Sequence, residues 1–430
     1  MNKGNIAHLI AEATHELLAA EPTLASLPAR QLTTAITTCL LRKVSHKAVQ
    51  LGSAIKKDAS FGLLRGGWLQ NRGRGGIIQD LALPSLLISQ AIAGRAPDKL
   101  VKQARAFATS RESSVTWYFA LAGVATGTRF HLAKNIQLIP WSDVPACAQK
   151  RDFELERSSR DWLDESLIRP ALRATASAAI RIRFKKAQVL FRSAEAEKVS
   201  LERQANEDVA MLDNVRDATR CLNLLSSSAV LDLGNWPVFD DPFASLLGSS
   251  GISYSSDIFD QSVALATWHP EAVDSSPVSQ LFRLFDKFDR SDKDVMRMAL
   301  DRLSQSMRKR NDVDRAIDLG IALEMLLLHE SERGELKYRF SVHGAMLLGG
   351  NKAERMATYK LLQNVYDLRS SAVHRGILKT RSSSGSPHAV LNAATAIGQR
   401  IGKKLIRLGA FPDWEADYVV GHGRRAATRG

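Results

Sequence analysis

Two side chains near the end of a predicted helix, Arg369 and His374, have the chemistry needed to cleave RNA without a metal. The unperturbed pKa of an imidazole lies near neutrality, so His374 could take a proton from a ribose 2′-hydroxyl or deliver one to the leaving oxygen. The guanidinium of Arg369 could hold a phosphate with two parallel hydrogen bonds and stabilise the charge of the transition state. The sequence contains no HExxH motif and no cluster of carboxylates for a metal, so we expect no cofactor.

The spacing of this pair limits how one helix could use it. Arg369 and His374 are five positions apart, which on a continuous helix separates them by about 140° around the axis. One helix therefore directs both at a single phosphate only if it ends between them. Alternatively, two copies of the segment could meet across a two-fold axis, each supplying part of the site. An arginine and a histidine at this separation also occur together by chance.

A second helix in the same region carries a single charge on an apolar stretch. Within residues 321–328 only Glu324 is charged, and helical spacing places it on one stripe with Ile317. We expect this carboxylate to point into a bundle and to require a cationic partner, because an unpaired buried charge is strongly destabilising. Arg339 and Arg369, on the following helices, are the candidates. A buried salt bridge that fixes the register of the helices is the role we favour for Glu324.

The residues after a Pro- and Ser-containing segment at about 271–280 are predicted to be purely helical. The pattern indicates one or two helices over 282–308, a helix capped by Asp312 or Asp314 that runs to about 328, and helices over 335–348, 354–371 and 389–408. Gly349-Gly350 and Gly409 mark helix ends. Short connections predict an up-and-down bundle. We therefore predict a mainly α chain with a mixed α+β region over residues 1–275 and a helical bundle over 278–420.

Three elements of this helical region occur in the order and spacing of a known family. They read DRAIDLGIALE at residues 314–324, Tyr-Arg-Phe at 338–340, and Tyr-Asp-Leu-Arg at 366–369 followed by Val-His at 373–374. Together they resemble the Apea-like branch of the HEPN superfamily over about residues 280–410. Two positions depart from the family pattern. Ser370 follows the arginine where Asn, Asp or His is frequent, and Arg375 separates His374 from Gly376.

The resemblance implies a bundle of four or five helices that forms a homodimer, with an R-x4-6-H motif at the dimer groove. In active members this motif makes a metal-independent endoribonuclease that leaves a 2′,3′-cyclic phosphate and a 5′-hydroxyl. Such domains are common in bacterial defence and toxin systems, and other members are catalytically silent modules for RNA binding or dimerisation. By this resemblance Arg369 and His374 are catalytic. The supporting groove residues are Glu324, Arg339, Ser370 and Asp367, and the RNA-binding strip is Arg375, Lys379 and Arg381.

The first 275 residues carry weaker signals and are expected to sense a trigger, bind RNA or regulate the bundle. Helices are predicted over 5–60, 77–125 and 195–225, strands near 129–139 and 180–184, loops with short strands over 226–256, and a possible subdomain break near 150. The Gly- and Arg-rich segment 62–76 is expected to be a flexible loop. Alternatively, Arg65 and Arg74 in this segment could contact phosphates while Trp68 stacks on a base.

The composition favours an anionic partner. The chain of 430 residues has 59 Lys and Arg against 45 Asp and Glu, a net charge of +14, and such a surplus favours nucleic acid over membrane. A generally basic surface is the simpler alternative. The three cysteines are far apart and suggest free thiols in a reducing compartment. No segment has the apolar length of a bilayer span, and the N-terminus lacks the apolar core of a signal peptide, so we expect a cytoplasmic protein.

Overall fold

The computed structural model describes residues 4–27, 29–71, 74–147, 149–150, 153, 176–192, 198–241, 243–244, 253–255, 270–309, 311–329, 334–378 and 386–418. This part of the chain is mainly helical, with strands in the N-terminal region, as predicted. The chain divides into two compact units. Unit 1 comprises Met1–Tyr118, Ile182–Leu212 and Trp236–Ile252, and unit 2 comprises Phe119–Arg181, Asp213–Asn235 and Ser253–Gly430. None of the described helices combines the length and apolarity needed to cross a membrane.

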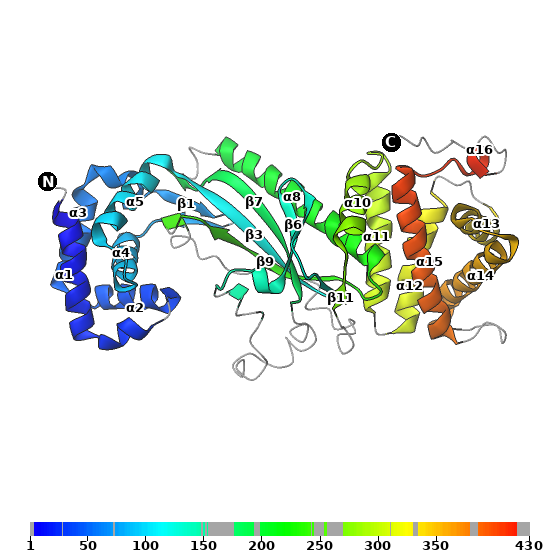
Figure 1. Cartoon of the computed structure of the whole chain (residues 1–430), viewed down its shortest axis with the longest axis horizontal. Helices are drawn as coiled ribbons and strands as arrows, with labels where there is room; N and C mark the ends of the chain where they lie inside the picture. The colour runs from blue at the N-terminus through cyan, green and yellow to red at the C-terminus, as the bar shows by residue number, and fades with distance from the viewer. Residues whose placement is uncertain are drawn as a thin grey trace. The chain divides into compact units, whose positions relative to one another are not determined.

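The helices of unit 1 are α1 (Gly4–Ala20), α2 (Ala29–Leu41), α3 (His46–Lys57), α4 (Ala82–Ile92) and α5 (Pro97–Ser110), with 3₁₀ helices η1 (Pro22–Ser26) and η2 (Ala59–Arg65) (Figure 1). Ser45 caps α3 by accepting a hydrogen bond from the Ala48 amide at 3.1 Å. Ile10, Leu17, Ile36 and Leu51 are fully buried between the helices. The predicted helices over residues 5–60 are thereby confirmed.

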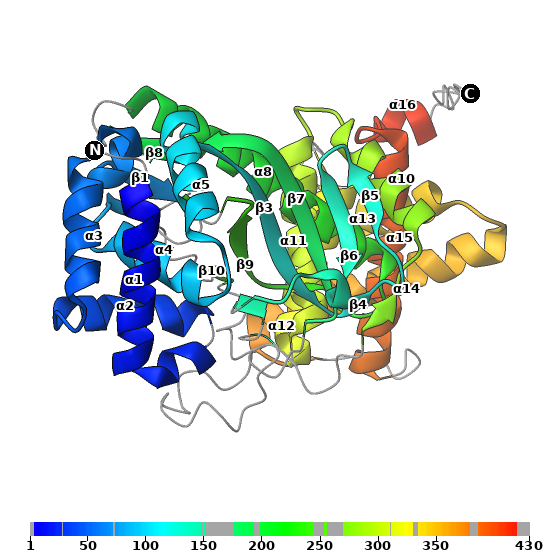
Figure 2. The same ribbon diagram turned by 60° about the vertical axis from the view of Figure 1, so that its left-hand side comes forward.

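A six-stranded sheet has the strand order β10-β9-β3-β7-β6-β5. Its strands are β3 (Glu112–Ala122), β5 (Phe130–Ala133), β6 (Ile136–Pro140), β7 (Ala178–Gln188), β9 (Leu231–Phe239) and β10 (Ser253–Tyr254). Figure 2 shows β3, β7 and β6 running side by side. Two short strands, β4 (Val124–Ala125) and β11 (Glu271–Ala272), pair in parallel. The strands predicted near residues 129–139 and 180–184 are confirmed.

The predicted helix over 77–125 is wrong in its last part. Arg111 adopts a left-handed conformation (φ 55°) that ends α5, and β3 begins at Glu112. Every residue of β3 from Val115 to Ala122 is buried, so this part of the strand is covered on both faces of the sheet. A continuous apolar run of this kind has no two-residue alternation, so hydrophobic periodicity cannot distinguish it from a buried helix.

The Gly- and Arg-rich segment is not the loop that we expected. Strand β1 (Trp68–Asn71) pairs antiparallel with β2 (Arg74–Ile77), and β1 also pairs with β8 (Leu190–Phe191). The pairing of Leu69 with Leu190 joins positions far apart in sequence. Local glycine content predicted a loop because the strand that stabilises this hairpin lies more than a hundred residues away.

The helices of unit 2 follow the predicted order. They are the C-terminal part of α8 (Lys198–Leu225), then α10 (Ser275–Asp286), α11 (Lys293–Arg308), α12 (Asp312–Leu327), α13 (Leu336–Leu348), α14 (Lys352–Arg375), α15 (Pro387–Leu408) and α16 (Trp414–Tyr418). Helix α15 packs against each of α10 to α14, and α12 packs against α11 and α14 (Figure 1). The apolar side chains Leu323, Phe340, Leu362 and Leu391 are fully buried in this bundle.

Three helix ends differ from the predictions. Helix α10 begins at Ser275, inside the expected linker. The residue that caps α12 is Asn311, whose side chain accepts from the Val313 amide at 2.8 Å, in place of Asp312 or Asp314. Helix α14 continues beyond residue 371 to Arg375, where Gly376 (φ 65°) provides the left-handed cap. Gly349 and Gly409 follow α13 and α15 as predicted.

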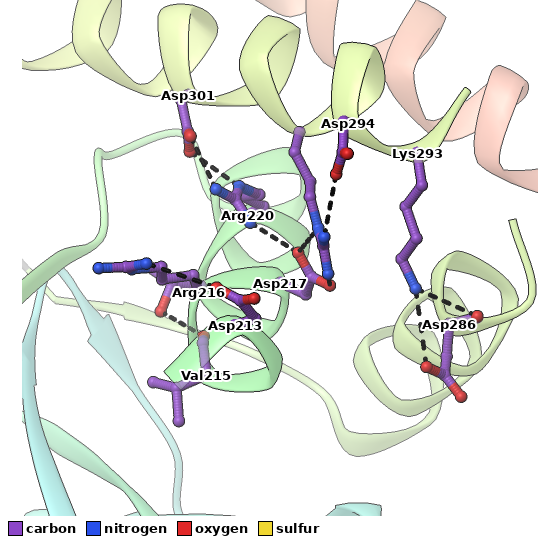
Figure 3. Close-up of polar contacts among 11 residues, drawn as sticks. Asp213, Val215, Arg216, Asp217, Arg220, Asp286, Lys293, Asp294 and Asp301 are labelled. Carbon is purple, nitrogen blue, oxygen red and sulfur yellow. Dashed lines mark hydrogen bonds and ion pairs between the residues drawn. The ribbon is translucent and has the colours of Figure 1, made fainter. Parts of the chain in front are cut away.

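Helix α8 is joined to α11 by a network of charged side chains around the buried Asp217 and Arg220 (Figure 3). Asp217 is 3% exposed and accepts hydrogen bonds from Arg220 Nη1 at 2.6 Å and from Arg297 Nη2 at 2.8 Å. Arg220 also donates to both carboxylate oxygens of Asp301, at 2.8 and 2.7 Å. Such a satisfied network fixes how two helices pack, because removal of one member leaves a buried charge without compensation.

Candidate functional site

Arg369 on α14 forms an ion pair with Glu324 on α12. The Arg369 Nη2 atom lies 3.1 Å from Glu324 Oε2, and the two side chains are 27% and 25% exposed. Partial burial raises the pKa of Glu324, and the nearby Arg369 guanidinium opposes this effect without cancelling it. The prediction that Glu324 needs a cationic partner is confirmed. Of the two candidates, the structure pairs it with Arg369.

The glycine at position 320 makes room for this arginine. A Cβ atom built on Gly320 would lie 2.3 Å from Arg369 Cγ and 2.7 Å from Arg369 Cβ, far closer than carbon atoms approach without a bond. The aliphatic part of Arg369 therefore lies directly on the backbone of α12. Gly320 is four positions before Glu324, on the same helix face. Our sequence interpretation missed this role, although a glycine one turn before the only charged residue of the stretch 321–328 was a visible signal.

Two buried polar atoms on α14 have no hydrogen-bond partner within the described part of the chain. They are Arg369 Nε and Ser371 Oγ. Ser370, between them in sequence, is half-buried. Buried polar groups in folded proteins are nearly always hydrogen-bonded, so an unsatisfied donor beside an ion pair is a feature that a bound group could explain.

His374 is exposed and lies in the last turn of the same helix as Arg369. Because α14 runs unbroken to Arg375, the helix does not end between the two residues. Their five-residue separation therefore directs them about 140° apart around the axis. The first of the two arrangements that the spacing left open, a helix ending between them, is wrong. One copy of α14 does not direct both side chains at the same phosphate.

The remaining predicted groove residues lie on α13 and α14. Asp367 accepts a hydrogen bond from Lys337 Nζ at 2.6 Å, which joins the two helices. Arg339 is half-buried on α13. Arg375 is exposed beside His374 at the C-terminal end of α14, where cations are favoured by the helix dipole. Lys379 and Arg381 lie outside the described residues.

The ring of His343 on α13 is held by a hydrogen bond and by stacking on an aromatic side chain. Its Nδ1 atom donates to the Leu327 carbonyl oxygen at 2.7 Å, and its ring stacks on Trp414 with a centroid distance of 4.2 Å. Burial lowers the pKa of His343, and the charge of Arg339 lowers it further. This histidine is therefore neutral and satisfied in the folded protein at neutral pH, whereas His374 is open to solvent.

The three N-terminal candidates belong to unit 1, whereas Arg369 and His374 belong to unit 2. Arg65 is exposed, and its Nη1 atom donates to the Lys56 carbonyl oxygen at 2.9 Å. Trp68 is half-buried in β1, and Arg74 begins β2. The three residues are thus carried by the end of η2 and by a hairpin.

The described residues contain no group of three or more His, Cys, Asp or Glu side chains that could hold a metal ion. In unit 2, the predicted catalytic residues comprise Arg369, which pairs with Glu324, and His374, which is exposed on the same helix. No family model, curated protein or solved structure matches this chain.

Proposed function

We propose that residues 278–420 form a HEPN-type bundle that acts as a metal-independent endoribonuclease in a homodimer. The observation that carries this proposal is the arrangement on α14: Arg369 is held by Glu324 of α12, and His374 is exposed on the same unbroken helix. The order of the helices and the motif spacing agree with the family resemblance described above. The proposed biological setting is bacterial defence or a toxin system.

In the proposed reaction, His374 is the general base that takes the proton from the ribose 2′-hydroxyl. The 2′-oxygen attacks the adjacent phosphorus, the bond to the 5′-oxygen breaks, and the products are a 2′,3′-cyclic phosphate and a 5′-hydroxyl. The protonated His374 then delivers this proton to the leaving 5′-oxygen. Arg369 stabilises the charge on the phosphate oxygens, and its ion pair with Glu324 sets the direction of the guanidinium.

The dimer is part of this proposal because of the helix geometry. Arg369 and His374 of one chain face directions about 140° apart, so Arg369 of one chain must work with the partner's His374. Two copies of α14 related by a two-fold axis would form two equivalent sites. Arg375 beside each His374 would add positive charge for the RNA backbone, as would Lys379 and Arg381 in the following residues.

The alternative is a catalytically silent HEPN module that binds RNA or mediates dimerisation. One observation favours it: Glu324 already engages the Arg369 guanidinium, which leaves fewer donors for a phosphate. Ser370, where active family members often have another residue type, points the same way. Under this alternative the basic chain binds RNA through its positive charge, without chemical change.

The test is cleavage of RNA in the presence of EDTA by the wild type, by His374→Ala and by a matched control, His388→Ala. His388 is another exposed histidine of the bundle, near the start of α15. We expect cyclic-phosphate products from the wild type and the control, and a loss of about 10²–10⁴-fold in rate for His374→Ala. Equal cleavage by all three proteins would eliminate His374, and RNA binding without cleavage by the wild type would favour the silent module.

Mixing two inactive variants tests whether the site is shared. In a heterodimer of Arg369→Ala and His374→Ala, one site carries both substitutions and the other carries neither. Random exchange of subunits should therefore restore about one quarter of the wild-type activity. Failure of the mixture to recover activity, with both variants still dimeric, would contradict a site built from two chains.

A further inference from the structure

A groove in unit 1 lies between the end of α2, one face of α3, the end of η2 and the start of α4. Its volume is about 370 Å³, within the range of small-molecule sites. The apolar part is lined by Leu40, Leu41, Val49, Leu64, Leu81 and Leu83. Leu41 is 67% exposed and Val49 is 42% exposed, so apolar surface remains open to solvent there. The groove therefore combines an enclosed apolar lining with an apolar rim.

Cations surround this apolar surface. Lys43, Lys56 and Arg65 line the groove, against a single carboxylate, Asp80. Asp80 pairs with Lys56 at 2.8 Å, and Arg65 donates to the Lys56 carbonyl oxygen at 2.9 Å. Within the described residues, no carboxylate forms an ion pair with Lys43. The groove therefore presents an uncompensated positive charge beside an apolar surface.

At two positions of the groove, another residue type would give the backbone greater stability. Lys43 follows α2 in a left-handed conformation (φ 54°), which glycine would adopt without strain. Gly52 lies inside α3, where alanine would favour the helix. A Cβ atom on Gly52 would meet only Pro84 Cγ, at 3.8 Å, so packing does not require a glycine. A glycine at 43 would remove a cation, and a larger residue at 52 would narrow the groove.

From these features we propose that the groove binds a small amphipathic anion, with an aliphatic or aromatic body on the apolar lining and a carboxylate at Lys43. The apolar lining accounts for the body of the ligand, and the uncompensated ammonium accounts for its charge. Gly52 lines the groove on α3 and adds no side chain to it. This site is independent of the RNA cleavage proposed for the bundle, because every lining residue lies in unit 1.

The test is titration calorimetry of the full chain with decanoate, decanol and decylammonium, each below its micellar concentration. We expect decanoate to bind more tightly than the other two, and Lys43→Gly to weaken decanoate binding about tenfold while leaving decanol unchanged. The melting temperature of Lys43→Gly should equal or exceed that of the wild type, because the left-handed strain is relieved. Equal affinity for all three probes would overturn the assignment of an anion.

Two substitutions at one position separate ligand binding from folding. Gly52→Ala should raise the melting temperature and keep decanoate binding, since its Cβ has room. Gly52→Leu should retain the fold and abolish binding, because the longer side chain extends into the groove. If Gly52→Leu bound decanoate as tightly as the wild type while remaining folded, the anion would bind elsewhere and the proposed site would be wrong.

Discussion

Replacing Gly320 by alanine should disturb Arg369 directly, although position 320 carries no functional group. The new Cβ would lie 2.3 Å from Arg369 Cγ and 2.7 Å from Arg369 Cβ. Carbon atoms in contact prefer a separation of about 3.5–4.0 Å, so the arginine stem or helix α14 must move by about 1 Å. That movement would take the guanidinium away from Glu324, to which it is now 3.1 Å.

The change in the free energy of unfolding is the sum of three contributions, two destabilising and one stabilising. Overpacking of a filled site costs about 1–3 kcal/mol. Loss of the partly exposed ion pair adds about 0.2–1 kcal/mol, and the higher helix propensity of alanine offsets about 1 kcal/mol. We expect Gly320→Ala to lower the free energy of unfolding by about 1–2 kcal/mol. If Arg369 stabilises the transition state as proposed, RNA cleavage should fall about 10²–10³-fold, since one charge-stabilising donor is displaced.

Urea denaturation followed by circular dichroism measures the stability change, and the EDTA-resistant cleavage assay measures activity. Gly398→Ala is the matched control, because its Cβ would meet only flexible leucine methyls, Leu303 Cδ1 at 3.1 Å and Leu323 Cδ2 at 3.5 Å. In an Arg369→Ala background, Gly320→Ala should lower the free energy of unfolding by less, since the contact with Arg369 Cγ is gone. If Gly320→Ala were as stable as the wild type, or if its cost were equal in both backgrounds, the proposed packing would be refuted.

Two further predictions concern stability. Asp217→Asn should lower the free energy of unfolding by about 3 kcal/mol, because it removes the buried carboxylate that pairs with two arginines. Asp213→Asn, in an exposed ion pair, should change the free energy of unfolding by less than about 1 kcal/mol. Urea denaturation midpoints of the two variants test this difference. The pKa of His343 is lower in the folded chain than in the unfolded chain, so the unfolded chain binds the proton at a higher pH as the solution is acidified. The free energy of unfolding should therefore fall as pH drops below about 6.5, the ordinary pKa of histidine. His343→Phe, which keeps the stacking on Trp414, should lose less stability between pH 7.5 and 5.5 than the wild type, and an equal loss in both proteins would exclude His343 as the titrating group.

The sequence predicts a helix end well where neighbouring residues determine that end. Glycines at 349 and 409 follow helices because a left-handed residue after the last turn is encoded in a few neighbouring positions. The predicted end of α14, at residue 371, falls before its observed end at Arg375. Ser370 and Ser371 are only moderate helix formers, so their local propensity favours an earlier end. Packing of Leu368 and Ala372, both buried, keeps the helix intact to Arg375.

Strands that depend on distant partners were less accessible to sequence reasoning. Strand β3 has no alternation of apolar and polar residues, because it is buried on both faces, so its sequence predicts a helix. The sequence of the β1–β2 hairpin predicts a loop, because β8, the strand that pairs with β1, lies far along the chain. In both elements, the deciding interactions join residues that sequence proximity does not connect.

By itself, the sequence determined that Glu324 lies on an apolar helix stripe and requires a cation, and it identified Arg369 and His374 as the pair with suitable chemistry. Only the tertiary structure decided between Arg339 and Arg369 as the partner of Glu324. The reason is geometric: which cation reaches a carboxylate depends on the rotation and depth of one helix against another. At this contact, the absence of a side chain at Gly320 allows Arg369 to lie on the backbone of α12.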